Sequence, residues 1–396
     1  MDVLCLNAGS SSLKFAVYRM AADKTETLLA EGEVERVGAP ESRLRAHAAR
    51  AKAPIERDES FPDHVAAVGG VFAAIEALGV SAPEAAGHRI VHGGPRHTVP
   101  ARIDASVRDD LRRLVALAPL HMPSGLAVID AVISKFPALP QVACFDTAFH
   151  HRLPELARRL PLPGWLWDEG IRKYGFHGLS YEYVLAALGP ATRGRVVIAH
   201  LGNGASLAAV RDGQPLDTTM GLTPTGGLVM GTRSGDLDPG VLLYLLREKR
   251  YDADALGRLV DREAGLVGIS GTTSDVRALL GAREHDPRAA LAIALFCYHA
   301  RKHIGAMAAV LGGLDTLVFT GGIGEHAAPV RAEVCAGLEH LGVRLDSARN
   351  ARGADSISAD DSACSVRVIP TNEDLMIARH VSALLAPLTA RAARGG

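Results

Sequence analysis

The 396-residue sequence lacks an excess of charge of either sign. Its 43 lysine and arginine residues are matched by 44 aspartate and glutamate residues, which gives a formal net charge of −1. General binding to nucleic acid or to an anionic membrane requires a basic surplus that neutralises phosphates. We therefore expect no nucleic-acid partner and no membrane partner.

Cysteine and long apolar runs are also scarce. The five cysteines are odd in number, scattered and without CxxC spacing, which favours buried thiols in a reducing cytoplasm over a disulfide or zinc framework. The longest apolar stretch, residues 289–298, is too short to span a bilayer, and no basic segment opens the chain. We expect a cytoplasmic protein.

Lysine supplies only seven of the 43 cations, so a lysine beside an unusual turn stands out. Glycine, in contrast, is abundant: its 41 residues exceed the average share of about 7%, which predicts many positions with unusual backbone. At roughly 100–200 residues per domain, the length predicts two domains with a cleft.

Short apolar runs rich in β-forming residues alternate with helical patterns, which predicts an α/β fold. Helices are expected over residues 239–247 and 287–312, because each follows an aspartate–proline pair that suits a helix start; a third is expected over 126–136. The polar segment 36–64 is expected to be a surface excursion of the first lobe. Strands are expected at residues 3–6, 15–18, 141–145, 196–200, 316–319 and 366–369.

One pattern occurs twice. Residues 4–17 and residues 198–210 each contain an apolar strand, a turn of asparagine, glycine and small hydroxyl residues, and a second apolar strand. Each predicts a β-hairpin whose tip can bring backbone N–H groups close to an anion. The repetition favours a duplicated lobe with both tips facing one cleft, and a chance similarity of two hairpins is the alternative.

Three cations occupy candidate positions. Lys14 follows the turn of the first hairpin and could contact a phosphate, or it could be an ordinary surface lysine. Arg89 ends a short strand before two glycines and suits bidentate recognition of a carboxylate or phosphate. Arg233 lies in a glycine-rich loop, where it could stabilise charge on a transferring phosphoryl group or simply be solvated.

Acids and histidines give weaker signals. Asp146 ends an apolar strand, where α/β folds place functional side chains, although it could also cap the following turn. His177 stands between two glycines, where a turn or core histidine is the alternative. His88 and His92 have a spacing that could hold zinc on a helix, but their glycine and β-branched neighbours oppose a helix.

Residues 316–326 form a strand, a glycine turn and a helix start, which is typical of a nucleotide loop. They also fit a loose dinucleotide pattern, with Asp346 about 20 residues further on. The alternative function is therefore a nicotinamide or flavin oxidoreductase, which leaves the paired hairpins, Lys14 and Arg233 without a role.

Taken together, these segments resemble the acetate and propionate kinase family of the actin, Hsp70 and sugar-kinase superfamily, from residue 3 to about residue 380. The resemblance implies two duplicated ribonuclease H-like lobes around a nucleotide cleft, with residues 1–145 and 375–396 in one and 146–374 in the other. It implies a homodimer that uses ATP and Mg²⁺, with Mn²⁺ as an alternative, to phosphorylate acetate or another short-chain carboxylate reversibly. A nucleotide-gated, chaperone-like member of this superfamily would need a large peptide-binding domain, for which this length leaves little room.

The resemblance also implies roles for single residues. Asp146, His177 and Arg233 correspond to catalytic residues, and Arg89 corresponds to the arginine that binds the carboxylate. Asn7 and Glu373 correspond to the Mg²⁺ site. The acyl methyl pocket would be lined by Val91, Leu120, Phe176 and Pro224. ADP and ATP would be bound by Lys14, His200, Leu201, Gly202, Asn203, Gly204, Asp275, Val276, Arg277, Gly322, Ile323, Gly324, Glu325 and His326.

Three residues, Met122, Gly125 and His326, depart from the family's pattern. The first two lie beside the implied acyl pocket and the third in the nucleotide loop, so they bear on acyl, base and metal preference. A carboxylate nucleophile is already ionised at pH 7. We therefore expect Asp146 to orient a group or the metal and not to abstract a proton.

Overall fold

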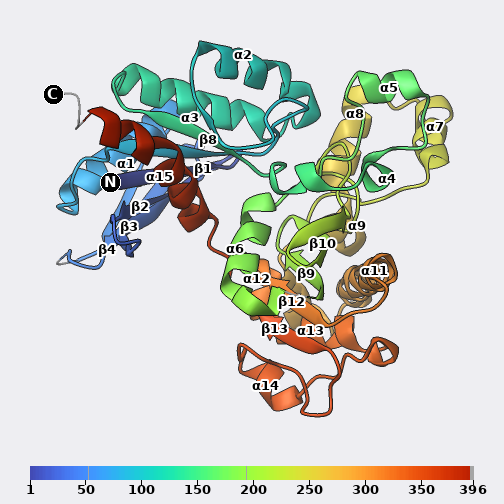
Figure 1. The fold of residues 1–396 in the computed structure, drawn as a ribbon. Coiled ribbons are helices and arrows are strands. Elements are labelled where there is room, and N and C mark those ends of the chain that lie inside the picture. The colour runs from blue at the N-terminus through green and yellow to red at the C-terminus, as the bar shows by residue number, and fades with distance from the viewer. Residues whose placement is uncertain (52, 193, 393–396) are drawn as a thin grey trace. The chain divides into compact units, whose positions relative to one another are not determined.

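The structure is a computed structural model that describes residues 1–51, 53–192 and 194–392 (Figure 1). The chain divides into two compact units: Met1–Ala148 together with the chain from Asn372 onward, and Phe149–Thr371. These limits differ from the expected ones by three residues, so Asp146 and Glu373 lie in the first unit and not in the second. The reason is that α15 (Glu373–Ala392) packs against β1, β2, β6 and β8 of the first unit.

The first unit is built on an eight-stranded sheet of order β5-β4-β3-β2-β1-β6-β8-β7. Its first five strands are paired antiparallel in succession, and β6 and β8 run parallel to β1. The strands are β1 (Asp2–Ala8), β2 (Ser12–Met20), β3 (Glu26–Glu35), β4 (Ser42–Ala48), β5 (Ile55–Glu59), β6 (Ala85–Ile90), β7 (Ala101–Arg102) and β8 (Gln141–Phe145).

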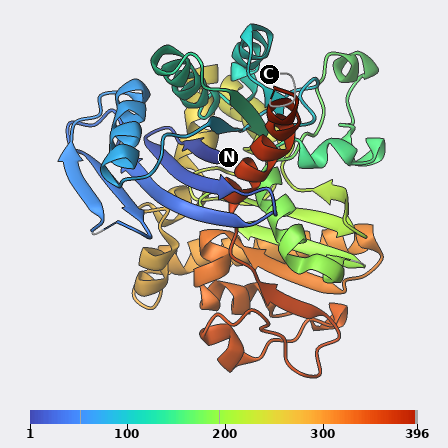
Figure 2. The ribbon, with the colours of Figure 1, turned by 60° about the vertical axis from the view of Figure 1, so that its left-hand side comes forward.

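Helices cover both faces of this sheet, because alternate residues of β1 are buried on opposite sides. Leu4 and Leu6 pack in a core with α1 (His64–Ala77) and α3 (Met122–Lys135). Cys5 points the other way, toward α15, where its thiol donates to the carbonyl of Asp374. In Figures 1 and 2, α15 therefore lies beside the first strands of the chain, although it comes last in the sequence. A further helix, α2, spans Ala105–Arg113.

The segment 36–64 is not a mere excursion, and the expectation was wrong here. It forms β4 and β5, which extend the sheet beyond β3. Leu44 is buried against the helices, whereas Arg43 on the other face pairs with Asp58 of β5, with Nε and Oδ1 2.6 Å apart. The polar pattern that suggested a surface excursion thus belongs to edge strands with one solvated face.

The second unit contains a five-stranded sheet of order β11-β10-β9-β12-β13. Its strands are β9 (Arg195–Leu201), β10 (Ala205–Arg211), β11 (Gln214–Thr218), β12 (Thr316–Thr320) and β13 (Ser365–Val368). The long helix α11 (Pro287–Leu311) packs against β9, β10 and β11. The other helices are α4 (Glu155–Arg158), α5 (Gly164–Asp168), α6 (Gly178–Leu188), α7 (Pro239–Arg247), α8 (Ala253–Arg258), α9 (Gly265–Ser270), α10 (Val276–Ala282), α12 (Gly321–His326), α13 (Ala328–Cys335) and α14 (Ser347–Ala351).

The two sheets share one topology, which confirms the expected α/β fold with duplicated ribonuclease H-like units. The order β3-β2-β1-β6-β8 in the first repeats as β11-β10-β9-β12-β13 in the second, with three antiparallel strands followed by two parallel ones. Both expected hairpins, β1–β2 and β9–β10, are present. The expected starts of α7 and α11 are confirmed, with Asp238 and Asp286 as N-caps.

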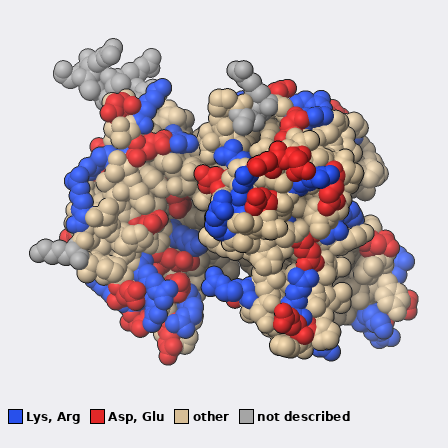
Figure 3. Space-filling view, turned by 90° about the horizontal axis from the view of Figure 1, so that it is seen from below, with Lys and Arg blue, Asp and Glu red and all other residues tan. Residues whose placement is uncertain are grey.

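None of the helices in the described residues is both long and apolar enough to cross a membrane. On the face drawn in Figure 3, basic and acidic side chains are interspersed. This face therefore shows no broad surface of one sign of charge that would attract a polyanion.

Candidate functional site

In the first unit, four of the predicted site residues meet around Arg89. The parallel strands β6 and β8 end at the same edge of the sheet, which places Arg89 beside Asp146. The guanidinium Nη2 lies 2.6 Å from Asp146 Oδ2, and Nε lies 3.0 Å from Oδ1. Nη1 donates to Asn7 Oδ1 at 3.1 Å, and Glu373 Oε2 lies 3.3 Å from Nε.

The charges of this cluster keep the Arg89 guanidinium protonated. Burial alone disfavours a charged Arg89, but Asp146 and Glu373 outweigh burial and raise its pKa. The Asp146 side chain is 1% exposed, whereas that of Arg89 is 20% exposed. Arg89 is thus a permanent cation, held in a fixed plane by Asp146 and still accessible on one side to a small anion.

Sequence reasoning missed Asp374, the neighbour of Glu373. Its carboxyl is buried, and burial together with the negative charge of Glu373 raises the pKa of Asp374 to about 7. Its Oδ1 has no hydrogen-bond partner among the described residues. The only signal in the sequence was its place directly after a predicted metal ligand.

Lys14 lies beside the Arg89 cluster, next to Asn7. It is opposite Asn7 across the β1–β2 ladder, so the two side chains share a face of the sheet. Its side chain is 59% exposed, and its Nζ is 4.0 Å from Glu33 Oε2. Such a long, exposed contact holds a lysine weakly, so Lys14 remains available to an anion at the hairpin tip.

In the second unit, two predicted histidines are stacked. The rings of His177 and His200 have centroids 4.2 Å apart and planes 19° apart. His177 has a left-handed backbone with φ of 58°, an uncommon conformation for a residue other than glycine that is often found at functional sites. His177 Nδ1 lies 2.8 Å from Ser206 Oγ, and His200 Nδ1 lies 2.8 Å from Ser180 Oγ.

Arg233 approaches the tip of the β9–β10 hairpin. It is buried, and its Nη1 donates to the carbonyl of Pro224 at 2.7 Å. A Cβ atom built on Gly204 would lie 2.8 Å from Arg233 Nη2 and 3.1 Å from His177 Nε2. Glycine at 204 therefore lets both donors reach the hairpin tip, and the structure brings these three predicted residues together.

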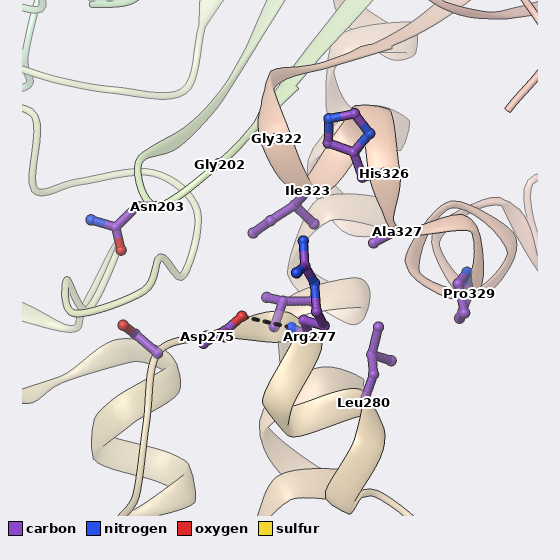
Figure 4. A pocket seen from close by; sticks show the side chains of 12 residues that line it. Gly202, Asn203, Asp275, Arg277, Leu280, Gly322, Ile323, His326, Ala327 and Pro329 are labelled. Atoms are coloured by element: carbon purple, nitrogen blue, oxygen red, sulfur yellow. Dashed lines mark hydrogen bonds between the residues drawn. The ribbon is translucent and has the colours of Figure 1, made fainter. Parts of the chain in front are cut away.

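A pocket of about 490 Å³ lies beside the same hairpin (Figure 4). Asp275 caps α10 by accepting a hydrogen bond from the Arg277 amide at 2.9 Å, which fixes the wall of the pocket. Apolar side chains line it together with an arginine, an aspartate and glycine backbone, a combination that suits a nucleotide. The predicted lining residues are Gly202, Asn203, Asp275, Val276, Arg277, Gly322, Ile323 and His326, and the sequence missed Ser274, Leu280, Ala327 and Pro329.

Two further predicted nucleotide residues, Gly324 and Glu325, make contacts within the protein. Glu325 Oε1 accepts hydrogen bonds from the backbone N–H groups of Gly321 and Thr371, at 2.9 and 3.1 Å. Arg331, which sequence reasoning missed, is fully buried and donates to the carbonyls of Gly324 and Glu325 at 2.9 and 2.8 Å. Glu325 and Arg331 thus hold the glycine turn in shape.

Other expected residues are divided between the units. Val91 and Leu120 lie in the first unit, and Phe176 and Pro224 lie in the second. His200 and Leu201 end β9 within the sheet, and both are buried. Because the four residues assigned to the acyl methyl pocket come from both units, that pocket stays a prediction.

The zinc and dinucleotide alternatives find no support in the geometry. His88 Nε2 is 2.7 Å from Gln141 Oε1, and burial lowers the His88 pKa to about 4. No three His, Cys, Asp or Glu side chains in residues 1–51, 53–192 and 194–392 are grouped to hold a metal ion. Asp346 caps α14 by accepting from the Arg349 amide, so its carboxylate is engaged in a helix start.

Comparisons with known proteins agree on one kind of relative. The model of the acetokinase family matches residues 2–379. The acetate kinase of Rhodopseudomonas palustris is 47% identical over 391 residues, which cover 96% of this chain and 97% of that protein. Among solved structures, Porphyromonas gingivalis acetate kinase has a TM-score of 0.86 at 37% identity, covering 97% of this chain and 99% of its own. A propionate kinase from Francisella tularensis has a TM-score of 0.89 at 35% identity, covering 96% and 98%.

Proposed function

The chain belongs to the acetokinase family, and from this premise we propose that it transfers the γ-phosphoryl group of ATP directly to acetate, giving acetyl phosphate and ADP reversibly. The single observation that carries this proposal is the full-length match to acetate kinases. The alternative function, a nicotinamide or flavin oxidoreductase, is therefore rejected. The roles of single residues below are part of the proposal.

Arg89 binds the acceptor. The carboxylate of acetate is ionised at neutral pH and needs no general base. The chemical difficulty is the approach of one anion to another, which a fixed cation relieves. Arg89 supplies that cation, and Asp146 orients it through the hydrogen bonds at 3.0 and 2.6 Å. Asp146 therefore acts on the arginine and takes no proton from the substrate. Val91, Leu120, Phe176 and Pro224 are assigned to the acyl methyl group.

Arg233 and His177 stabilise the transferring phosphoryl group. In such reactions, negative charge lies on the equatorial phosphoryl oxygens, and preorganised donors lower the barrier. The Arg233 guanidinium is held by Pro224 and the His177 ring by Ser206. Both donors are therefore in place before substrate binds and need no rearrangement during the reaction.

The nucleotide occupies the pocket of Figure 4. Val276, Leu280 and Ile323 offer apolar surface to the base, while Gly322, at the start of α12, offers its backbone N–H group to a phosphate. The N–H groups of Gly202 and Gly321 are already bonded to Gly204 and Glu325. Lys14 is assigned to the phosphate side of the nucleotide.

Asn7 and Glu373 would hold Mg²⁺, with Mn²⁺ as an alternative. Their amide and carboxylate oxygens are the donors that Mg²⁺ prefers, and Mg²⁺ is usually bound by one or two carboxylates plus substrate phosphates. The buried Asp374 Oδ1 without a partner, next to Glu373, supports this fit. When bound, the ion would neutralise charge on the phosphates of the nucleotide.

Formation of an acyl phosphate tests the function. The protein is incubated with ATP, Mg²⁺ and acetate, propionate or butyrate, and the acyl phosphate is trapped with hydroxylamine. We expect acetyl hydroxamate in amounts that depend on ATP and that fall strongly in Arg233→Ala. Wild-type protein that yields no more hydroxamate than a reaction without enzyme would contradict the proposal.

A homodimer is proposed from the surface of α7. Its Val241, Leu243 and Tyr244 are 43%, 48% and 53% exposed, an apolar surface that is costly in water unless a partner covers it. A second copy of the chain is the partner that the resemblance implies. Leu243→Glu should lower the mass measured by light scattering to that of a monomer, whereas Val65→Glu, at an apolar site on α1 that is 57% exposed, should not. A wild-type monomer would contradict the dimer.

A cytoplasmic location is proposed from the thiols. All five cysteines are buried and none forms a disulfide, and burial raises the pKa of Cys297 to about 12. Buried thiols outside disulfides are typical of a reducing compartment. Fractionation of cells that express the protein tests the location.

A further inference from the structure

The hydroxyl groups of Tyr181 and Ser206 form a chain of hydrogen bonds that ends at the ring of His177. Tyr181 and Ser206 are fully buried. Tyr181 Oη lies 2.5 Å from Ser206 Oγ, which lies 2.8 Å from His177 Nδ1. Neither hydroxyl has another hydrogen-bond partner among the described residues. The chain of contacts runs from α6 through β10 to the imidazole.

The positions of the hydrogens follow from a count of donors. If Nδ1 carried the ring proton and donated to Ser206 Oγ, either the serine or the tyrosine hydrogen would have no acceptor, because the two hydroxyls share one contact. A buried donor without an acceptor costs about 1–3 kcal/mol. Only the order Tyr181 to Ser206 to Nδ1 uses both hydroxyl hydrogens. Nδ1 is then an acceptor, and the proton of the neutral ring lies on Nε2.

The neighbouring histidine repeats this arrangement. Thr371 Oγ1 donates to Ser180 Oγ at 2.9 Å, and Ser180 Oγ lies 2.8 Å from His200 Nδ1. With Thr371 as the donor, the hydrogen of the buried Ser180 has His200 Nδ1 as its acceptor, which places the proton of a neutral His200 on Nε2. Arg233 also faces His177, since its Nη2 approaches the same point above Gly204. A positive His177 would be repelled by Arg233, which favours a neutral ring.

We propose that Ser206, whose hydroxyl is bonded to Tyr181 on its other side, is a positioning residue that keeps His177 a neutral imidazole with its proton on Nε2. This nitrogen is the one directed at Gly204, beside Arg233. His177 then presents a hydrogen-bond donor of fixed direction to a phosphoryl oxygen throughout the physiological pH range. The inference rests on the proposed phosphoryl transfer for its role in catalysis, but the state of the ring can be measured without turnover.

The measurement is the ¹⁵N spectrum of the histidine rings in the full-length protein without ligands. His177 is assigned by the signals that disappear in His177→Gln. We expect Nε2 to be protonated and Nδ1 unprotonated from pH 5.5 to 8. A proton on Nδ1, or titration of the ring near pH 6.5, would overturn the proposal.

Two variants separate positioning from stability. Ser206→Ala leaves the buried hydroxyl of Tyr181 without a partner, which itself destabilises. The double variant Ser206→Ala/Tyr181→Phe removes both hydroxyls together, so that no buried hydroxyl is left without a partner. We expect the double variant to fold, to lose the single ring state of His177, and to show a turnover number reduced by up to about 10²-fold with the KM for acetate little changed. Its rate should acquire a pH dependence that the wild type lacks.

Tyr181→Phe alone and Ser358→Ala are the controls. With Tyr181→Phe, Ser206 can still donate to Nδ1, so the ring state should persist. Ser358 is buried and bonds to the backbone of Val366, so Ser358→Ala should alter stability without moving the His177 spectrum. A double variant with wild-type ring signals and pH profile would refute the positioning role. If the ring state is as expected but no acyl phosphate forms, the proposed function fails and this inference about the ring stands.

Discussion

The two units use one scaffold for different chemistry. Aligning the hairpins by their last cross-strand pairs, Ala8 with Leu13 and Leu201 with Ala205, makes Asn7 equivalent to His200 and Lys14 equivalent to Ser206. Following the parallel registers to the next strands makes Arg89 equivalent to Thr320 and Asp146 equivalent to Thr371. These four pairs of residues therefore occupy matched positions at the same edge of two like sheets.

The difference lies in the type of group at each matched position. The first unit holds an ion pair, Arg89 with Asp146, whereas the second holds two threonines at these positions. Thr371 contacts His200 through Ser180, and the buried Thr320 Oγ1 has no hydrogen-bond partner among the described residues. A permanent charge suits a carboxylate acceptor, while neutral donors beside Arg233 suit phosphoryl oxygens. The two sheets thus provide matched positions, and the different residues at those positions give each unit its own chemistry.

The largest expected effect comes from removing one arginine in each unit. Arg89→Ala and Arg233→Ala should each lower kcat/KM by about 10²- to 10³-fold, because a charge-stabilising group is lost. If the units divide the work as proposed, Arg89→Ala raises the KM for acetate and Arg233→Ala lowers kcat. Steady-state kinetics with varied acetate and ATP measure both.

Arg43→Ala serves as the matched control for these arginines, since Arg43 forms an exposed pair with Asp58 in the β4–β5 extension. Exposed pairs contribute little, so its kinetics should match the wild type. Wild-type turnover in Arg233→Ala would break the comparison between the units.

Acid should weaken both units through one buried histidine each. Burial lowers the pKa of His88 and of His150 to about 4, whereas an unfolded histidine titrates near 6.5. The unfolded chain therefore binds a proton first as the pH falls below 6.5, and stability that is complete above that pH is lost toward pH 4. Each histidine should cost about 2 kcal/mol of unfolding free energy between pH 7 and pH 5.

Urea unfolding of His88→Gln and His150→Gln at both pH values checks this sign. Each variant should lose less stability on acidification than the wild type. His340→Gln, at an exposed position, should lose as much unfolding free energy between pH 7 and pH 5 as the wild type does. Equal pH slopes in all four proteins would show that neither histidine is kept neutral in the folded state.

The smallest effects concern two adjacent glycines at the start of α12. Gly321 has φ of 75°, and a Cβ there would lie 2.8 Å from the carbonyl of Leu201, whereas nothing lies within 4 Å of a Cβ on Gly322. Gly321→Ala should lower the unfolding free energy by about 1–2 kcal/mol. Gly322→Ala should leave stability within about 0.5 kcal/mol.

The same pair sharpens the assignment of the nucleotide pocket. Gly322 lines the pocket, so its added methyl group should raise the KM for ATP several-fold without changing that for acetate. Thermal unfolding and kinetics on both variants give the test. An unchanged KM for ATP in Gly322→Ala would remove this turn from the phosphate contacts.

Local patterns in the sequence were sufficient for most elements. The hairpins, the starts of α7 and α11 and the strands of both sheets follow from alternation, small-residue turns and capping pairs, which depend on near neighbours. Residues 36–64 misled because an edge strand with one solvated face has few apolar residues. The predicted residues Asn7, Arg89, Asp146 and Glu373 meet because their strands and α15 share one sheet.

By itself, the sequence determined the α/β class, the repeated hairpin, the charge balance and the side-chain types available for chemistry. Only the tertiary structure decided which hydroxyl stands behind which histidine, that Asp374 is buried without a partner for Oδ1, and that Arg331 holds the glycine turn. Those relations join residues far apart in the chain. Hydrogen bonding and burial depend on distance in space, which residue spacing along the sequence does not specify.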